Sequence, residues 1–238
     1  MSLPKLNNAP KYELTVPSTK ELITFRPFLV KEEKILMMAV ESEDQAAAVR
    51  AVVDTIDSCV DGGIEKEKLT TFDVEYLFTQ IRAKSVGETA KIMLKCQKCE
   101  EENEVHINLD EISVTWPDPV PSGVIDLGND IKLHMKWPKY YDVVDSGVLT
   151  GEGSLTNQTF STLLKCIDAV ETADERVRMA DETLEEQMSF VEQLTKAQLD
   201  EIQKFIEAIP KMQSEIKYAC TKCGHDNQIH LEGMQNFF

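Results

Sequence analysis

Two cysteine pairs with identical spacing are the residues of this chain best suited to chemistry. Cys96 and Cys99 form one C-x-x-C turn, and Cys220 and Cys223 form another. Such a turn brings two sulfur atoms to one side of a tight loop, and a tetrahedral zinc ion in a structural site takes four ligands of this kind. We therefore predict that the four thiolates bind one structural Zn²⁺ ion.

The residues around the two pairs also repeat, always 124 positions apart. The repeated residues are Ile92, Cys96, Lys98, Cys99, Asn103 and His106, which recur as Ile216, Cys220, Lys222, Cys223, Asn227 and His230. Lys98 and Lys222 place positive charge beside thiols that must ionise to bind a metal. Gly224 suits a turn position with positive φ, which Glu100 occupies in the first pair. Strand-like stretches flank each turn, at 91–95 and 105–109 and at 215–219 and 228–231, which is the pattern of a zinc ribbon.

The separation of the two pairs is unusual. A ribbon commonly separates them by about 15–20 residues, whereas 120 residues intervene here, so the site would be split by an inserted segment. Two alternatives remain, namely reduced or disulfide-linked turns without metal, and a thioredoxin-like redox motif, for which the βαβ context is missing. His106 and His230 are not expected to be ligands, because four thiolates already fill a tetrahedral shell.

Composition favours a globular protein that is kept in a cytoplasm. The chain has 238 residues, of which 42% are hydrophobic, enough for one large or two modest domains. No apolar run approaches the roughly 20 residues of a membrane span, and residues 1–5 carry no apolar signal segment. In a cytoplasm, C-x-x-C pairs favour metal over disulfide. Cys59 and Cys166 lie on apolar helical faces and are expected to be core residues.

The charge balance argues against a nucleic-acid partner. The formal net charge is −17, with 42 Asp and Glu against 25 Lys and Arg, and such a surface repels phosphate backbones. Residues 152–208 hold thirteen acidic and five basic residues. We interpret them as a solvated helical face in preference to a docking surface for a basic partner.

Periodicity and turn signals predict an α+β fold. It combines an N-terminal β-hairpin and helices with the split zinc-ribbon-like four-cysteine site and an inserted β-rich and helical segment. Strands are expected at 12–16, 21–25, 112–116 and 131–137, besides those that flank the cysteine turns. Helices are expected at 30–40, 44–59, after Thr71 to Gly87, 140–147, 156–172, 181–193 and 196–209, the last with a capping box from Thr195 and Gln198.

The chain divides into six segments on this interpretation. They are a flexible arm (1–10), an N-terminal α+β unit (11–95), the first zinc knuckle and strand (96–109), a β-rich segment (110–138), an acidic helical segment (139–212), and the second knuckle with a C-terminal tail (213–238). Trp116 and Trp137 are expected to pack in a core. Phe237 and Phe238 could insert into a partner's groove or pack against their own domain.

No catalytic motif is present in the sequence. We find no G-x-S-x-G, no phosphate-binding glycine loop and no H-E-x-x-H. A zinc ion with four cysteine ligands has no open coordination position for a substrate. The protein is therefore predicted not to be an enzyme, although a metalloenzyme or redox enzyme would require only a labile thiol or an open metal position.

Two segments resemble a known family. One comprises PKYELTVP (10–17), FRPFLVKEEK (25–34) and MMA (37–39), and the other comprises TFDVEYLF (71–78) and QIRAKSVG (80–87). Together they resemble the baseplate hub subunit and baseplate hub assembly protein family of T-even-like, contractile-tailed bacteriophages. The resemblance is strongest over residues 10–95, and it carries over no functional residues.

The resemblance implies a structural or assembly protein of the central hub of the phage tail baseplate. Its partners would be other baseplate hub proteins, and its place would be the host bacterial cytoplasm during assembly, with the virion tail baseplate as the final location of a hub component. One alternative is an assembly chaperone of the hub that is absent from the virion. A more distant one is a zinc-ribbon regulator that binds nucleic acid. Stoichiometry, symmetry and oligomeric state do not follow from the sequence.

Overall fold

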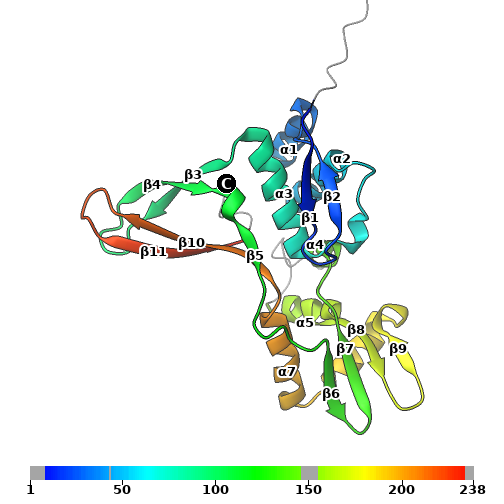
Figure 1. Cartoon of the computed structure of the whole chain (residues 1–238). Coiled ribbons are helices and arrows are strands. Elements are labelled where there is room, and N and C mark those ends of the chain that lie inside the picture. The colour runs from blue at the N-terminus through cyan, green and yellow to red at the C-terminus, as the bar shows by residue number, and fades with distance from the viewer. Residues whose placement is uncertain (1–8, 43, 146–154, 234–238) are drawn as a thin grey trace, which may run out of the picture. The chain divides into compact units, whose positions relative to one another are not determined.

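The structure, a computed structural model, describes residues 9–42, 44–145 and 155–233, which belong to two compact units. The first unit combines residues 1–115 with 211–238, and the second comprises residues 116–210 (Figure 1). The second unit is therefore inserted in the sequence between the two cysteine pairs. This arrangement and the mixture of helices and strands confirm the predicted α+β fold class.

The N-terminal part of the first unit is a β-hairpin with three helices. Thr70 and Asp73 form a capping box at the start of α3, one residue earlier than predicted, and Gly87 ends this helix with φ +145°. The elements are β1 (Tyr12–Thr15), β2 (Leu22–Phe25), α1 (Val30–Glu41), α2 (Gln45–Cys59), the 3-10 turn η1 (Lys66–Lys68) and α3 (Thr71–Val86). Their core contains the fully buried side chains of Phe25, Ile56, Phe72, Leu77 and Ile81.

Two long hairpins complete the first unit (Figure 1). They are β3 (Thr89–Lys95) with β4 (Glu102–Asn108), and β10 (Lys211–Ala219) with β11 (Asp226–Glu232); η2 (Leu109–Glu111) and β5 (Ser113–Thr115) follow β4, and β5 pairs with β10. Ile92 pairs with Val105, and Ile216 pairs with Ile229. Residues that lie 124 positions apart in the sequence therefore have equivalent strand partners in the two hairpins. Residues of both hairpins share one hydrophobic cluster, which includes Ala90, Ile107, Met212 and Leu231.

The second unit is a four-stranded antiparallel sheet with helices. The strand order is β6-β7-β8-β9. The elements are β6 (Val124–Gly128), β7 (Ile131–Met135), α4 (Tyr140–Asp145), α5 (Leu155–Cys166), β8 (Ile167–Glu171), β9 (Arg176–Arg178), η3 (Met179–Asp181), α6 (Leu184–Glu192) and α7 (Lys196–Glu207). Its core joins Leu133 and Ile167 of the sheet to Leu163, Ile202 and Phe205 of the helices.

The prediction of one helix over 156–172 is wrong. The helix ends at Cys166, and residues Ile167–Glu171 form β8 between β7 and β9. Ile167 and Ala169 are fully buried while Asp168 between them is half-buried, which is the two-residue alternation of a strand. The predicted capping box of Thr195 and Gln198 is confirmed. Trp137 stacks on Phe205 with ring centroids 4.4 Å apart, as expected for a core residue.

Some predicted features lie outside the described residues. They are positions 1–8 of the predicted arm, positions 146–147 of the predicted helix 140–147, and the terminal pair Phe237 and Phe238. Within the described ranges, no helix has the length and apolar character needed to cross a bilayer.

Candidate metal centre

Each cysteine pair occupies the turn of a long hairpin, and the two turns have the same backbone hydrogen bonds. In the first, the Cys96 N–H donates to the Glu101 carbonyl and the Glu100 N–H donates to the Cys96 carbonyl, both at 2.9 Å. In the second, Cys220 N–H donates to His225 and Gly224 N–H donates to Cys220, again at 2.9 Å. The repeated sequence therefore forms two copies of one knuckle.

Both knuckles need a residue with positive φ directly after the second cysteine. Gly224 has φ +66° and Glu100 has φ +60° at the equivalent position. Glycine adopts this conformation without steric cost, whereas a residue with a side chain does so less readily. The first knuckle thus keeps the same turn despite its less suitable residue, because the surrounding hairpin imposes that geometry.

The four cysteine sulfurs converge on one point. Their Sγ atoms all lie within 4.8 Å of one another. Cys96 Sγ is 3.7 Å from Cys223 Sγ, and Cys99 Sγ is 3.7 Å from Cys220 Sγ. Four sulfurs at about 2.3 Å from a tetrahedral ion are separated by about 3.8 Å. The donor set and its spacing therefore fit a tetrahedral metal ion, and each close contact joins one knuckle to the other.

The protonation of the four thiols shows why a cation suits this site. Backbone N–H groups of Cys223 and Lys222 donate to Cys220 and lower the pKa of its thiol to about 6. At Cys99 the backbone N–H of Glu101 acts in the same direction, but the neighbouring thiols of Cys223 and Cys220 and burial outweigh it and raise the pKa to about 12. Four thiolates thus require a positive ion between them.

The two lysines of the knuckles lie in different surroundings. Lys222 Nζ is 2.6 Å from a carboxylate oxygen of Glu101 in the other knuckle, so it forms an ion pair that joins the two hairpins. The backbone N–H of Lys98 is directed at Cys96 Sγ, at 3.4 Å. The contribution of Lys98 in the structure is therefore this backbone hydrogen bond.

Two asparagines also support the site, although no role for them was predicted from the sequence. Asn103 Oδ1 accepts hydrogen bonds from the backbone N–H of Thr221 at 2.9 Å and from its hydroxyl at 3.0 Å. Asn227 Oδ1 accepts one from the backbone N–H of Gln97 at 2.8 Å. Both side chains are buried. Their recurrence in the 124-residue repeat was the signal that could have identified them.

The other predicted residues are placed as follows. His106 is exposed and its Nε2 lies 3.3 Å from Glu104, and the metal-type cluster among the described residues contains the four cysteines alone. Cys59 and Cys166 are buried. Burial raises the pKa of Cys59 to about 11 and that of Cys166 to about 12, so both remain neutral thiols in the core.

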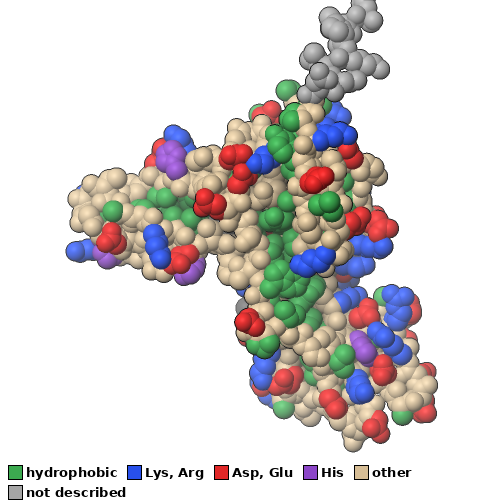
Figure 2. All heavy atoms as spheres, viewed as in Figure 1, with side chains coloured by type: hydrophobic (Ala, Val, Ile, Leu, Met, Phe, Trp, Pro, Cys, Tyr) green, Lys and Arg blue, Asp and Glu red, His purple; other side chains and the backbone are tan. Residues whose placement is uncertain are grey.

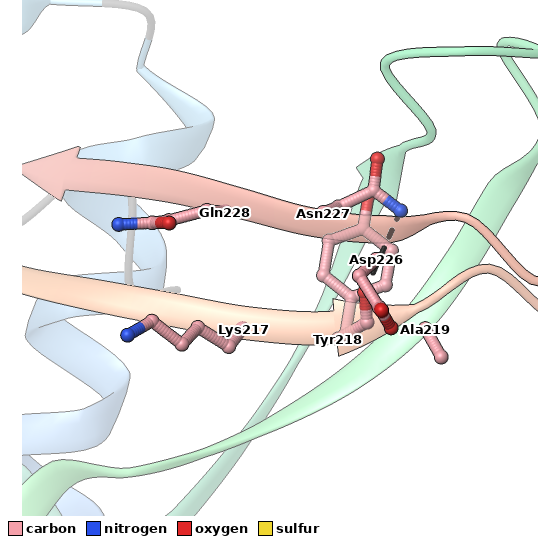
Figure 3. Close-up of a pocket in the computed structure, with 6 residues that line it drawn as sticks. All are labelled: Lys217, Tyr218, Ala219, Asp226, Asn227 and Gln228. Carbon is pink, nitrogen blue, oxygen red and sulfur yellow. Dashed lines mark hydrogen bonds between the residues drawn. The ribbon is translucent and has the colours of Figure 1, made fainter.

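A groove of about 370 Å³ follows the β10–β11 hairpin next to its knuckle (Figure 3). It is lined by Lys217, Tyr218, Ala219, Asp226, Asn227 and Gln228. The hydroxyl of Tyr218 donates to the carbonyl of Lys95 at 2.9 Å and so joins this hairpin to the first. The lining contains one carboxylate and one amine, and in Figure 3 Lys217 extends away from Asp226.

Comparison with known proteins gives one match. A family model described as T4 bacteriophage base plate protein matches residues 9–238. Searches of curated proteins and of solved structures found no match.

Proposed function

Since this chain belongs to the family of T4 bacteriophage base plate proteins, we propose that it acts in the central hub of the baseplate by binding other hub proteins. The observation that supports this role is the family match over nearly the whole chain, residues 9–238. A baseplate structural protein works through the surfaces that it presents to its neighbours, and the two converging knuckles offer a device that would fix those surfaces.

We infer that this device is a structural Zn²⁺ ion, which Cys96, Cys99, Cys220 and Cys223 would bind. The spacing of the four sulfurs supports this assignment, and thiolate ligands are typical of structural zinc sites. When bound, the ion supplies a crosslink and not a reaction, because four thiolates leave no position for a substrate. The residues themselves supply the turn geometry and the backbone N–H donors that favour thiolates.

The crosslink would join two parts of the first unit that are far apart in the sequence. Cys99 and Cys220 are separated by 120 residues, which include the whole second unit. Bringing such distant segments together has an entropic cost that grows with the length of the loop. A metal ion that binds both knuckles would offset this cost and hold the hairpins in one arrangement.

The surface of the hairpins supports protein partners in preference to nucleic acid. On the face in Figure 2, lysine, acidic and histidine side chains are interspersed over the two hairpins, without a continuous basic field. Nucleic-acid-binding ribbons need a positive surface that neutralises phosphates, whereas this chain has a net charge of −17. A gel-shift assay at low salt should accordingly detect no tight binding.

Co-purification from infected cells tests the hub assignment. An affinity-tagged chain, expressed during infection by the phage that encodes it, should retain other hub proteins, and an equally tagged Cys99→Ser variant should retain less of them. Mass spectrometry of purified particles would then assign the protein to the virion or to assembly intermediates. Recovery of no hub protein with the wild-type chain would contradict the proposal.

A further inference from the structure

Helix α1 exposes an unusual amount of apolar surface. The side chains of Val30, Val40, Met37, Met38 and Ile35 are 78%, 73%, 58%, 58% and 51% exposed. Glu32 is the one residue of this helix that is buried. A helix with apolar side chains on nearly every face is normally covered by another element, and a contiguous exposed apolar surface commonly marks an interaction site.

The outward side of α1 has a definite order of side chains. With 3.6 residues per turn, Val30, Lys34, Met37 and Glu41 follow one another along a single line, opposite the buried Glu32. Met38 lies beside Met37. Lys34 and Glu41 thus flank a methionine pair, and neither forms an ion pair with a residue that the structure describes.

This order is complementary to itself under a twofold rotation. If two α1 helices pack antiparallel about an axis between Met37 and Met38, the methionines face each other and Lys34 of each copy faces Glu41 of the other. A parallel arrangement would instead place like charges together. Symmetric dimers use one surface on both subunits, so a contact of this kind closes on itself.

We propose that α1 is the dimerisation surface of this protein, pairing antiparallel with α1 of a second copy through a Met37–Met38 centre and two Lys34–Glu41 ion pairs. Methionine side chains adapt readily to a packed interface. Because the surface is one helix, the interface is small and the dimer is reversible. The proposal is independent of the metal centre, which lies on the hairpins.

The base of α1 is fixed in a way that suits this role. Arg26 Nη2 lies 2.9 Å from Glu32 Oε1, and Glu32 Oε2 accepts the N–H of Leu29 at 2.8 Å. These bonds hold the first turn of the helix to the end of β2. The outward side chains are therefore presented by a positioned helix, which lowers the entropic cost of association.

Charge exchange tests this geometry with the full-length chain. Lys34→Glu places acidic residues at both 34 and 41, and Glu41→Lys places basic residues at both. Two copies of either variant would therefore repel each other across the α1–α1 contact. An equimolar mixture restores both ion pairs, as does the double variant K34E/E41K. Glu33→Lys changes an exposed charge of the same helix off this line and is the matched control.

Sedimentation velocity over a concentration series at low salt provides the readout. We expect wild type, Glu33→Lys and the double variant to dimerise, each single variant to weaken dimerisation by about tenfold or more, and the mixture to recover it. Circular dichroism verifies that each variant is folded. A wild-type protein that stays monomeric at all concentrations, or single variants that dimerise like wild type, would overturn the proposal, and so would a mixture that shows no recovery.

Discussion

Asn103 and Asn227 lie 124 residues apart and each accepts a hydrogen bond from the knuckle of the other hairpin. Asn103 on β4 bonds to the backbone N–H of Thr221, and Asn227 on β11 bonds to that of Gln97. Each asparagine also donates to a carbonyl of its own turn, Glu101 or His225. The two hairpins are therefore joined by a reciprocal pair of hydrogen bonds in addition to the convergence of their cysteines.

Replacing either asparagine by alanine is predicted to destabilise the first unit. Asn103→Ala and Asn227→Ala each leave an amide N–H of the opposite knuckle without its partner, which costs about 1–3 kcal/mol. Urea unfolding should show a similar loss of the free energy of unfolding for both variants. Gln228→Ala, which removes an exposed side chain of the same hairpin, is the control and should change little. A loss of stability in only one of the two asparagine variants would contradict the reciprocal arrangement.

Replacing any one of the four knuckle cysteines by serine is predicted to have the same effect as replacing any other. Each substitution removes one of the four ligands of a single shared ion. Structural zinc contributes about 10 kcal/mol or more to the folding free energy of small domains. The larger hydrophobic core of this unit makes its stability less dependent on the ion. Bound zinc and the melting temperature should both fall. Cys59→Ala should keep its zinc, because Cys59 lies in the core. Loss of only half the zinc in a variant would indicate two separate sites.

Removing the metal is predicted to expose thiols in a defined order. With zinc bound, the four knuckle cysteines should react slowly with a thiol reagent, and Cys59 and Cys166 should stay unreactive because they are buried. After addition of a strong chelator, the exposed Cys223 should react before the half-buried Cys99, whose thiol has a raised pKa. Mass spectrometry of alkylated peptides measures this order. Rapid reaction of all four cysteines before chelation would argue against a bound ion.

The ion pair of Arg26 and Glu32, at the start of α1, is predicted to make a pH-dependent contribution to the free energy of unfolding. Although burial opposes ionisation, hydrogen bonds from Arg26 and the Leu29 N–H lower the pKa of Glu32 below its usual range. A carboxyl with a lowered pKa stabilises the fold above its unfolded-state pKa, and this stabilisation is lost as pH falls through the folded-state pKa.

Glu32→Gln should therefore reduce the free energy of unfolding by about 2 kcal/mol at pH 7. The difference from wild type should shrink below about pH 4, where wild-type Glu32 becomes protonated. Denaturant unfolding of both proteins across a pH series measures this difference. Glu33→Gln, which changes an exposed neighbour, is the control. A difference that stays constant from pH 7 to pH 3 would show that the ion pair is not its source.

The convergence of the four cysteines could be predicted from the sequence because the information for each turn is local. A C-x-x-C turn determines its own geometry, and the repeated flanks indicated that Cys96 and Cys220 belong to equivalent turns. Asn103 and Asn227 belonged to the same repeat, but buried asparagines acquire a role only through the partner that they reach. That partner, a backbone N–H of the opposite knuckle, is a tertiary contact that no spacing along the chain specifies.

The fold was predictable where one helical period dominated the sequence, as in α7, which buries Ile202 and Phe205. It was not predictable after Cys166, where the apolar residues of α5 continue without a break into β8. Ile167 and Ala169 suit a helix as well as a strand when considered alone, and pairing with β7 and β9 decides between them. The short strand β9 also depends on its sheet partner, so its local sequence gave no prediction, and β6 was predicted only as part of the β-rich segment 110–138.

Zinc content is the most direct test of the central claim, that two distant knuckles form one metal site. Freshly purified full-length protein, prepared without chelators, should contain one zinc ion per chain by elemental analysis, and none after Cys96→Ser or Cys220→Ser, one variant in each knuckle. Wild-type protein with no zinc, or a variant that retains the wild-type amount, would contradict the account.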